Sequence, residues 1–278
     1  MRTAMEIQTS SSATPPQAQP SSWLTPIATV TGNLYLVVGT TFFSIMTLLV
    51  SLLPLRPRSA TVSWIARTWS SGILKTSWLR VRVAGGEALD PQASYVFLAN
   101  HQSLFDIPAL LGTSPCPMRM MAKRSLFRIP IFGWSMAAGG FIPIDRGGDK
   151  GGSGQGADGN SARQSFSTAV ARLQKGTSIL LFPEGTRSFT DVLLPFQRGG
   201  FLLAMKTGLP IVPVGVRGTR AVQRKDSFAI HPGTVEVRYG APIDIAAYGI
   251  RRKKELIAEV RSRIAELAGL DAGGEAEA

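Results

Sequence analysis

The sequence predicts an α/β fold, a sheet covered by helices, preceded by an N-terminal membrane-anchoring helical segment. Three observations support this prediction. Short β-rich runs alternate with helical patterns over most of the chain beyond residue 80. Hydrophobic residues make up 44% of the 278 residues, enough for a sizeable packed core. Before the alternation begins, the run from Leu34 to Leu53 carries no charge and is mostly apolar.

The N-terminal part divides into a tail and two helical segments. We expect residues 1–26 to form a flexible tail, because positions 7–22 are rich in Ser, Thr, Pro and Gln and have little to bury. Residues 27–79 are predicted to form membrane-anchoring helices. As a helix, the run 34–53 is about 30 Å long, enough to cross the hydrocarbon core of a bilayer.

Two alternatives remain for the apolar run, a buried core helix and a cleaved signal peptide. Arg56 and Arg58 follow it directly without a small-residue cleavage pattern, which disfavours the signal peptide. The same arginines favour the cytoplasmic side for the chain that follows. A second segment, Ala60 to Leu79, has apolar residues at helical spacing among tryptophans and cations. Such a helix suits either a membrane interface or packing against the globular domain.

Residues 80–270 are predicted to form the α/β domain. Its strands are expected at 81–83, 95–98, 118–121, 141–144, 178–182, 211–216 and 235–239. Its helices are expected at 107–111, 131–138, 162–174, 200–207 and 253–268. A Gly-rich insert at 147–160 interrupts the domain, and it lacks the phosphate-loop pattern GxxxxGK[ST]. Residues 271–278 are expected to be a frayed acidic tail.

Charge and residue scarcity limit the function classes. The net charge of +12 suits an anionic partner, such as an acidic membrane surface, a phosphorylated substrate or nucleic acid. Cys116 is the single cysteine, which excludes an intrachain disulfide, and we interpret it as a small core residue. With only two histidines, His101 and His231, a histidine metal centre is not expected.

The segment Asn100-His101-Gln102-Ser103-Leu104-Phe105-Asp106 directly follows an apolar predicted strand. On one continuous helix, residues five apart diverge by about 140°. His101 and Asp106 therefore converge only if His101 lies in a turn and Asp106 begins a helix, which Pro108 tolerates in its first turn. Asp106 would then fix the imidazole tautomer and leave the other ring nitrogen to take a proton. A helix cap formed by Asp106, or by Ser103 and Asp106, is the structural alternative and is compatible with catalysis.

Two further segments end strands with polar residues. In FPEGTRS, residues 182–188, the glycine permits close backbone approach, and Thr186 and Arg187 suit phosphate recognition. In GFIPIDR, residues 140–146, the strand ends in an Asp-Arg pair. An ordinary turn with an exposed arginine and a surface ion pair are the respective structural alternatives.

In order along the chain, NHQSLFD, GFIPIDR, FPEGTRS and IVPVGV resemble the four motifs of the glycerolipid acyltransferase family. The resemblance is closest to bacterial 1-acyl-sn-glycerol-3-phosphate acyltransferases, also called lysophosphatidic acid acyltransferases. AKRSLFRIPIFGW, residues 122–134, and PFQRGGF, residues 195–201, resemble further segments of that family. The resemblance covers roughly residues 95–216 and implies a mixed sheet flanked by helices. The Gly-rich insert after Arg146 departs from the pattern.

The resemblance also implies a reaction, phospholipid biosynthesis by acyl transfer. His101 would deprotonate the sn-2 hydroxyl of lysophosphatidic acid, which attacks the thioester of acyl-CoA or acyl carrier protein to give phosphatidic acid. Asp106 would orient His101, and neither a cofactor nor a metal is needed. The residues implied to bind the glycerophosphate end of the acceptor are Arg146, Glu184, Gly185, Thr186 and Arg187, with Lys123 as a further candidate. The expected location is the membrane, with the catalytic domain on the cytoplasmic side of the inner membrane.

Three other functions compete with this interpretation. A different lysolipid acceptor, such as a lyso-ornithine lipid, would use the same His-Asp chemistry. A hydrolase is disfavoured because the chain has no GxSxG elbow. A non-enzymatic membrane-surface or nucleic-acid-binding protein would account for the charge, but the cations are scattered apart from 251–254 and no nucleic-acid module is recognised.

Overall fold

The structure is a computed structural model that describes residues 23–53, 58–144, 159–173, 175–224, 227–249 and 251–273. Within these ranges the strands are β1 (Leu79–Ala84), β2 (Val96–Ala99), β3 (Met118–Lys123), β4 (Ile142–Ile144), β5 (Ser178–Leu181), β6 (Ile211–Arg217) and β7 (Gly233–Tyr239). The helices are α1 (Leu24–Leu52), α2 (Arg58–Thr76), α3 (Asp106–Thr113), α4 (Phe132–Ala138), α5 (Gly159–Leu173), α6 (Gly199–Thr207), α7 (Thr219–Val222) and α8 (Lys253–Ala268).

The strands form one mixed sheet in the order β1-β7-β6-β2-β5-β3-β4. Every neighbouring pair is parallel except β6 and β7, which run antiparallel. Because β2 lies between β6 and β5, the segments that follow β2 and β5 leave the sheet side by side at its carboxyl edge. The predicted fold class, a mixed sheet flanked by helices, is confirmed.

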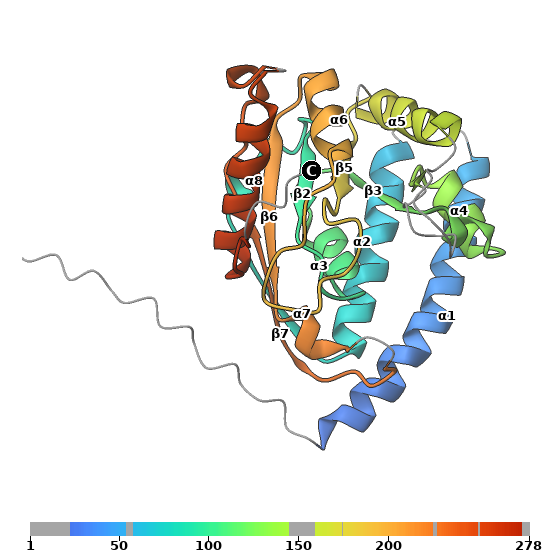
Figure 1. Ribbon diagram of the computed structural model, residues 1–278. Helices are drawn as coiled ribbons and strands as arrows, with labels where there is room; N and C mark the ends of the chain where they lie inside the picture. Colours follow the sequence, from blue (N-terminus) through green and yellow to red (C-terminus); the bar gives the residue numbers. More distant parts are fainter. Residues whose placement is uncertain are drawn as a thin grey trace, which may run out of the picture.

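The central strands are apolar on both faces because helices cover both (Figure 1). In β2, Phe97 and Ala99 enter one core with α1, α2, α3 and α4, whereas Val96 and Leu98 enter a second core with α5, α6 and α8. This double burial is why the strand is a continuous hydrophobic run rather than an alternating one. In β6, Gly215 lets α8 pack closely, since a Cβ there would meet the Leu267 carbonyl carbon at 2.3 Å.

The N-terminal helices lie along the domain rather than apart from it. α2 buries Ile73 and Leu74 in the first core, and its Val62 and Ile65 are also buried, which favours the packed alternative over a free interfacial helix. α1 starts ten residues before the predicted apolar run and packs beside α2 and α4 (Figure 1). It is long and apolar enough to cross a membrane by length and composition. Residues 1–22, 145–158 and 274–278 lie outside the described residues, so the predicted tail 1–26, insert 147–160 and acidic tail 271–278 stay predictions over those positions. α1 begins at Leu24 and α5 at Gly159, inside the bounds predicted for the tail and the insert.

Candidate active site

The turn that carries His101 is fixed to the sheet by the residue before it. Asn100 follows the last residue of β2 and is completely buried. Its amide donates to the Val216 carbonyl at 2.9 Å and its oxygen accepts the Val216 N–H at 2.7 Å. A buried side chain with both groups satisfied holds one conformation, because a shift would leave backbone groups of β6 unpaired. His101 therefore leaves the sheet from a defined point.

His101 and Asp106 form a buried hydrogen-bonded pair. Nδ1 of His101 lies 2.8 Å from Oδ2 of Asp106, and the two side chains are 6% and 0% exposed. Asp106 is the first residue of α3 and His101 lies in the preceding turn, which is the arrangement that convergence requires. An ionised carboxylate only accepts, so Nδ1 carries the proton and Nε2 of the neutral ring is an acceptor. Among the described residues Nε2 has no hydrogen-bond partner, which leaves it available to a substrate hydroxyl.

Asp106 also holds the turn itself. The same Oδ2 atom accepts the backbone N–H groups of Gln102 at 2.7 Å and Ser103 at 2.9 Å. The carboxylate therefore combines the two interpretations of the motif, since it closes the turn before α3 and orients the imidazole. Oδ1 is buried without a partner in the described part of the chain.

The segment after β5 packs against this turn. Phe182 stacks on the imidazole, with ring centroids 4.0 Å apart and planes inclined by 17°. Glu184 is 4% exposed, and its Oε1 accepts the His101 N–H at 2.8 Å. Its Oε2 accepts the Leu194 N–H at 2.9 Å. Burial raises the pKa of Glu184, and the two backbone donors partly oppose that shift.

Gly185 turns the chain outward after Glu184. Its φ of +69° lies in the left-handed region, where a side chain is strained. The turn leaves Thr186 exposed and Arg187 half-buried, with the guanidinium carbon 5.9 Å from the Phe189 ring centre. A hydroxyl and a forked cation are thus presented at the surface beside the His101 turn.

The remaining predicted site residues lie further along the sheet or outside the described residues. Lys123 ends β3, which neighbours β5, and pairs in register with Ile144 of β4. Arg146 lies outside the described residues. Within the described ranges, no group of three or more His, Cys, Asp or Glu side chains is placed to hold a metal ion.

Sequence reasoning missed three partners of the His101 turn. Asn100 and Phe182 stand within quoted motifs but received no role, and Ser188 donates its N–H to the His101 carbonyl at 2.7 Å. A polar Asn directly after a wholly apolar strand is a signal for the first of these. The other two need knowledge that β2 and β5 are neighbours, which the chain order does not provide.

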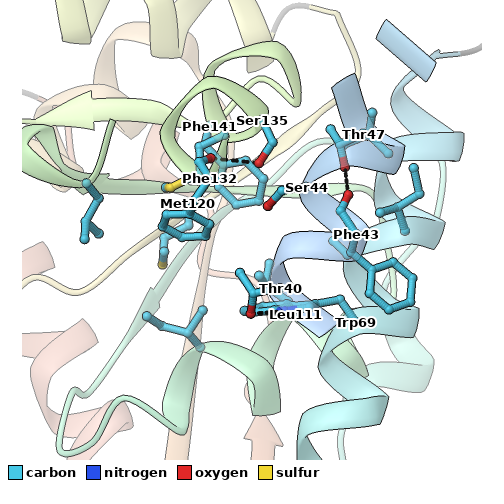
Figure 2. Close-up of a pocket in the computed structure, with 16 residues that line it drawn as sticks. Thr40, Phe43, Ser44, Thr47, Trp69, Leu111, Met120, Phe132, Ser135 and Phe141 are labelled. Carbon is cyan, nitrogen blue, oxygen red and sulfur yellow. Dashed lines mark hydrogen bonds between the residues drawn. The ribbon is translucent and has the colours of Figure 1, made fainter. Parts of the chain in front are cut away.

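An apolar cavity of about 140 Å³ lies between α1, α2, α3 and α4, beside β3. Figure 2 shows its wall, where Trp69, Phe132 and Phe141 surround the space. The hydroxyls on the wall are largely satisfied within it. Thr40 accepts the Trp69 indole N–H at 3.0 Å, and Ser135 and Thr47 donate to nearby backbone carbonyls. The cavity reaches Ile107 of α3, the residue that follows Asp106.

Comparison with known proteins agrees with these observations. The acyltransferase family model matches residues 80–217. A 1-acyl-sn-glycerol-3-phosphate acyltransferase of Salmonella typhimurium is 33% identical over 62% of this chain and 67% of its own length. The one of Pseudomonas aeruginosa is 29% identical over 84% of this chain and 87% of its length.

Two further relatives extend the comparison. A chloroplast 1-acyl-sn-glycerol-3-phosphate acyltransferase of Brassica napus is 34% identical over 73% of this chain, which spans only about half (55%) of that relative's length. In fold, the chain resembles the crystal structure of the 1-acyl-sn-glycerophosphate acyltransferase of Thermotoga maritima, with a TM-score of 0.73, 24% identity, and coverage of 88% of this chain and 95% of that one. The family match includes both strand ends that form the His101 site. The chain therefore belongs to the acyltransferase family.

Proposed function

We propose that the chain transfers a fatty acyl group from a thioester to the sn-2 hydroxyl of 1-acyl-sn-glycerol-3-phosphate, giving phosphatidic acid. The observation that carries this proposal is the buried His101–Asp106 pair whose Nε2 has no hydrogen-bond partner among the described residues. The names of the relatives support the acceptor. The donor is acyl-CoA or acyl carrier protein, and no cofactor is assigned.

In the proposed reaction, Nε2 of His101 takes the proton of the acceptor hydroxyl as its oxygen attacks the thioester carbonyl. The new C–O bond forms, the C–S bond breaks, and the imidazolium returns the proton to the departing thiolate. Asp106 stabilises the imidazolium and keeps the proton on Nδ1 in the resting state. No covalent acyl-enzyme is required, because the substrate hydroxyl is itself the nucleophile.

The acceptor's phosphate is assigned to Lys123, at the end of β3, and to Gly185, Thr186 and Arg187, which follow β5. Arg146, which lies outside the described residues, is assigned to the same group from its motif. Arg187 can offer two parallel N–H groups to a phosphate, and Thr186 can offer a hydroxyl. The two residues lie three and two positions after Glu184, the partner of the His101 N–H. Glu184 has no place in this set, because both its carboxylate oxygens already accept backbone N–H groups. A carboxylate would also repel the phosphate.

The membrane is the proposed location. One face of α1 is exposed and apolar, with Val30, Leu34 and Val38 exposed by 66%, 62% and 58%. Its other face contacts the protein along its length, from the bond of Thr29 Oγ1 with Ile230 N–H at 2.9 Å to the cavity wall at Thr47. A helix attached on one side suits a position in the membrane plane, with the exposed face in lipid. The arginines that follow α1 in the sequence and the cytoplasmic origin of acyl donors support a position of the domain on the cytoplasmic side of the inner membrane.

The test is an acyl-transfer assay on the detergent-purified protein. Lysophosphatidic acid, lyso-ornithine lipid and neutral lysolipids are offered in turn, each with acyl-CoA and with acyl carrier protein. We expect transfer to lysophosphatidic acid, and loss of at least a hundredfold in folded His101→Ala protein. Transfer to a phosphate-free lysolipid alone would replace the acceptor assignment, and no transfer to any acceptor would reject the function.

A further inference from the structure

Glu184 is a buried carboxylate whose bonds all go to the protein backbone. Its two oxygens accept N–H groups from two separate segments, His101 after β2 and Leu194 in the loop before α6. Removing such an acceptor would leave the buried His101 N–H and the partly buried Leu194 N–H without a partner, which destabilises both segments. One of these ends is the residue that carries the proposed base.

We propose that Glu184 is a positioning residue that holds the backbone of His101 in place for proton transfer, rather than a ligand of the acceptor's phosphate. The inference rests on the proposed acyl transfer and adds a role to a residue that touches neither substrate. It follows from geometry: the carboxylate bonds the N–H of His101, while Asp106 bonds the imidazole of the same residue. Main chain and side chain of His101 are thus fixed by two different carboxylates.

The second backbone partner of Glu184, Leu194, is in turn bonded to α8. Leu194, its second partner, is also held by Arg261 of α8, whose Nη1 donates to the Leu194 carbonyl at 2.6 Å. Nη2 of Arg261 donates to the Leu193 carbonyl at 2.6 Å, and the guanidinium lies 5.0 Å from the Phe196 ring centre. Glu184 is therefore connected through Leu194 to α8, a sixteen-residue helix packed on β6.

The segment 182–188, which includes Glu184, also contacts the carbonyl and the ring of His101. Ser188 donates its N–H to the His101 carbonyl at 2.7 Å, and Phe182 stacks on the imidazole. Residues 182–188 therefore hold both backbone polar groups of His101 and one face of its ring. A shift of about 1 Å at the reacting group can cost roughly a hundredfold in rate, so this support acts on turnover.

The experiment uses the full chain in detergent and compares Glu184→Gln with the wild type. A glutamine keeps one carbonyl oxygen but turns an NH₂ group toward the second backbone N–H, which disrupts one of the two bonds. Glu266→Gln is the matched control, since Glu266 lies in α8 with its side chain 73% exposed. Both kcat and the acceptor KM are measured, with Arg187→Lys as the comparison expected to raise the acceptor KM.

A second readout uses the presence of only two histidines in the chain. Imidazole ¹⁵N resonances of His101 and His231 are recorded in each variant, with His231→Gln identifying which signal is which. We expect Glu184→Gln to move the His101 signals and leave those of His231 unchanged. We expect kcat to fall roughly 10- to 100-fold while the acceptor KM stays within twofold.

An acceptor KM that rises at unchanged kcat and unchanged His101 signals would overturn the proposal and return Glu184 to the acceptor site. Unchanged kinetics and spectra would also overturn it. If Glu184→Gln does not fold, Glu184→Asp takes the same measurements, because it keeps the charge but shortens the reach to the two donors. Absence of transfer in the wild type rejects the proposed function, whereas the resonance comparison still decides whether Glu184 positions His101.

Discussion

Replacing Asp106 by asparagine separates the charge of the carboxylate from its geometry. All three hydrogen bonds of Asp106, from the His101 ring and the N–H groups of Gln102 and Ser103, end on the single atom Oδ2. The amide oxygen of an asparagine can occupy that position and keep all three. The NH₂ group then falls where Oδ1 now lies, buried and without a partner among the described residues.

The magnitude of the effect follows from that arrangement. With the three bonds retained, Nδ1 keeps its proton and Nε2 stays an acceptor, so the correct tautomer survives. What is lost is the charge that supports the imidazolium, worth about 1.5–3 kcal/mol for a hydrogen bond to a charged group. At about 1.36 kcal/mol per tenfold, kcat is expected to fall roughly 10- to 150-fold. Because the NH₂ group replaces an oxygen that is already buried and unpaired, the free energy of unfolding should change by less than the roughly 1–3 kcal/mol that a newly unpaired buried group costs.

The assay measures single-turnover acyl transfer by Asp106→Asn and His101→Ala at matched folded concentration, alongside thermal unfolding. Asp106→Asn should retain clear activity above His101→Ala. In a serine protease triad, the corresponding change drops kcat about 10⁴-fold because the wrong tautomer forms. A loss of that size here, in folded protein, would refute the argument that the amide oxygen keeps the three bonds. Unchanged kcat would show that the charge has no role.

Three further outcomes follow from the described contacts. Arg187→Lys should raise the acceptor KM at least tenfold at similar kcat, because the forked pair of donors is lost; unchanged acceptor kinetics would make Arg187 structural. Cys116 is 1% exposed and burial raises its pKa, so a thiol reagent should modify it only after unfolding; rapid modification of the native protein would contradict its buried position. Replacing three exposed α1 side chains by Gln should weaken vesicle binding at least tenfold and leave activity on a short-chain, water-soluble acceptor within twofold. The three are Val30, Leu34 and Val38. An equal loss of activity on a bilayer-embedded acceptor and on the water-soluble one would mean that this face supports the fold.

The strands were the most predictable part of the fold. Each is a short apolar or alternating run with turn residues at its ends, and all seven form close to their expected bounds. The start of α1 was less predictable, because the polar residues Thr29 and Asn33 precede the apolar run. Their side chains bond Ile230 and Phe228, about 200 residues away, and such contacts leave no local pattern.

The candidate site likewise has parts that the sequence predicts and parts that it does not. The His101–Asp106 pair was accessible from sequence because both residues lie within one turn, where spacing limits the geometry. The contact between His101 and Glu184 spans 83 residues and depends on β2 lying beside β5. Arg119 was also missed: it is 2% exposed within apolar β3 and donates to the Gly139 carbonyl at 2.6 Å and the Ser63 hydroxyl at 2.9 Å. Burial lowers its pKa to about 10.

The order of the strands explains why the His101 turn can be rigid with few residues of its own. β2 has β6 on one side and β5 on the other, and the turn after it is bonded to both. Asn100 pairs with Val216 of β6, whereas Glu184 and Ser188 after β5 take the N–H and the carbonyl of His101. His101, the proposed base, is thus held by contacts with the segments of both neighbouring strands before any substrate binds. Substitutions in these supports should therefore change kcat, and those in the exposed Thr186–Arg187 turn should change the acceptor KM.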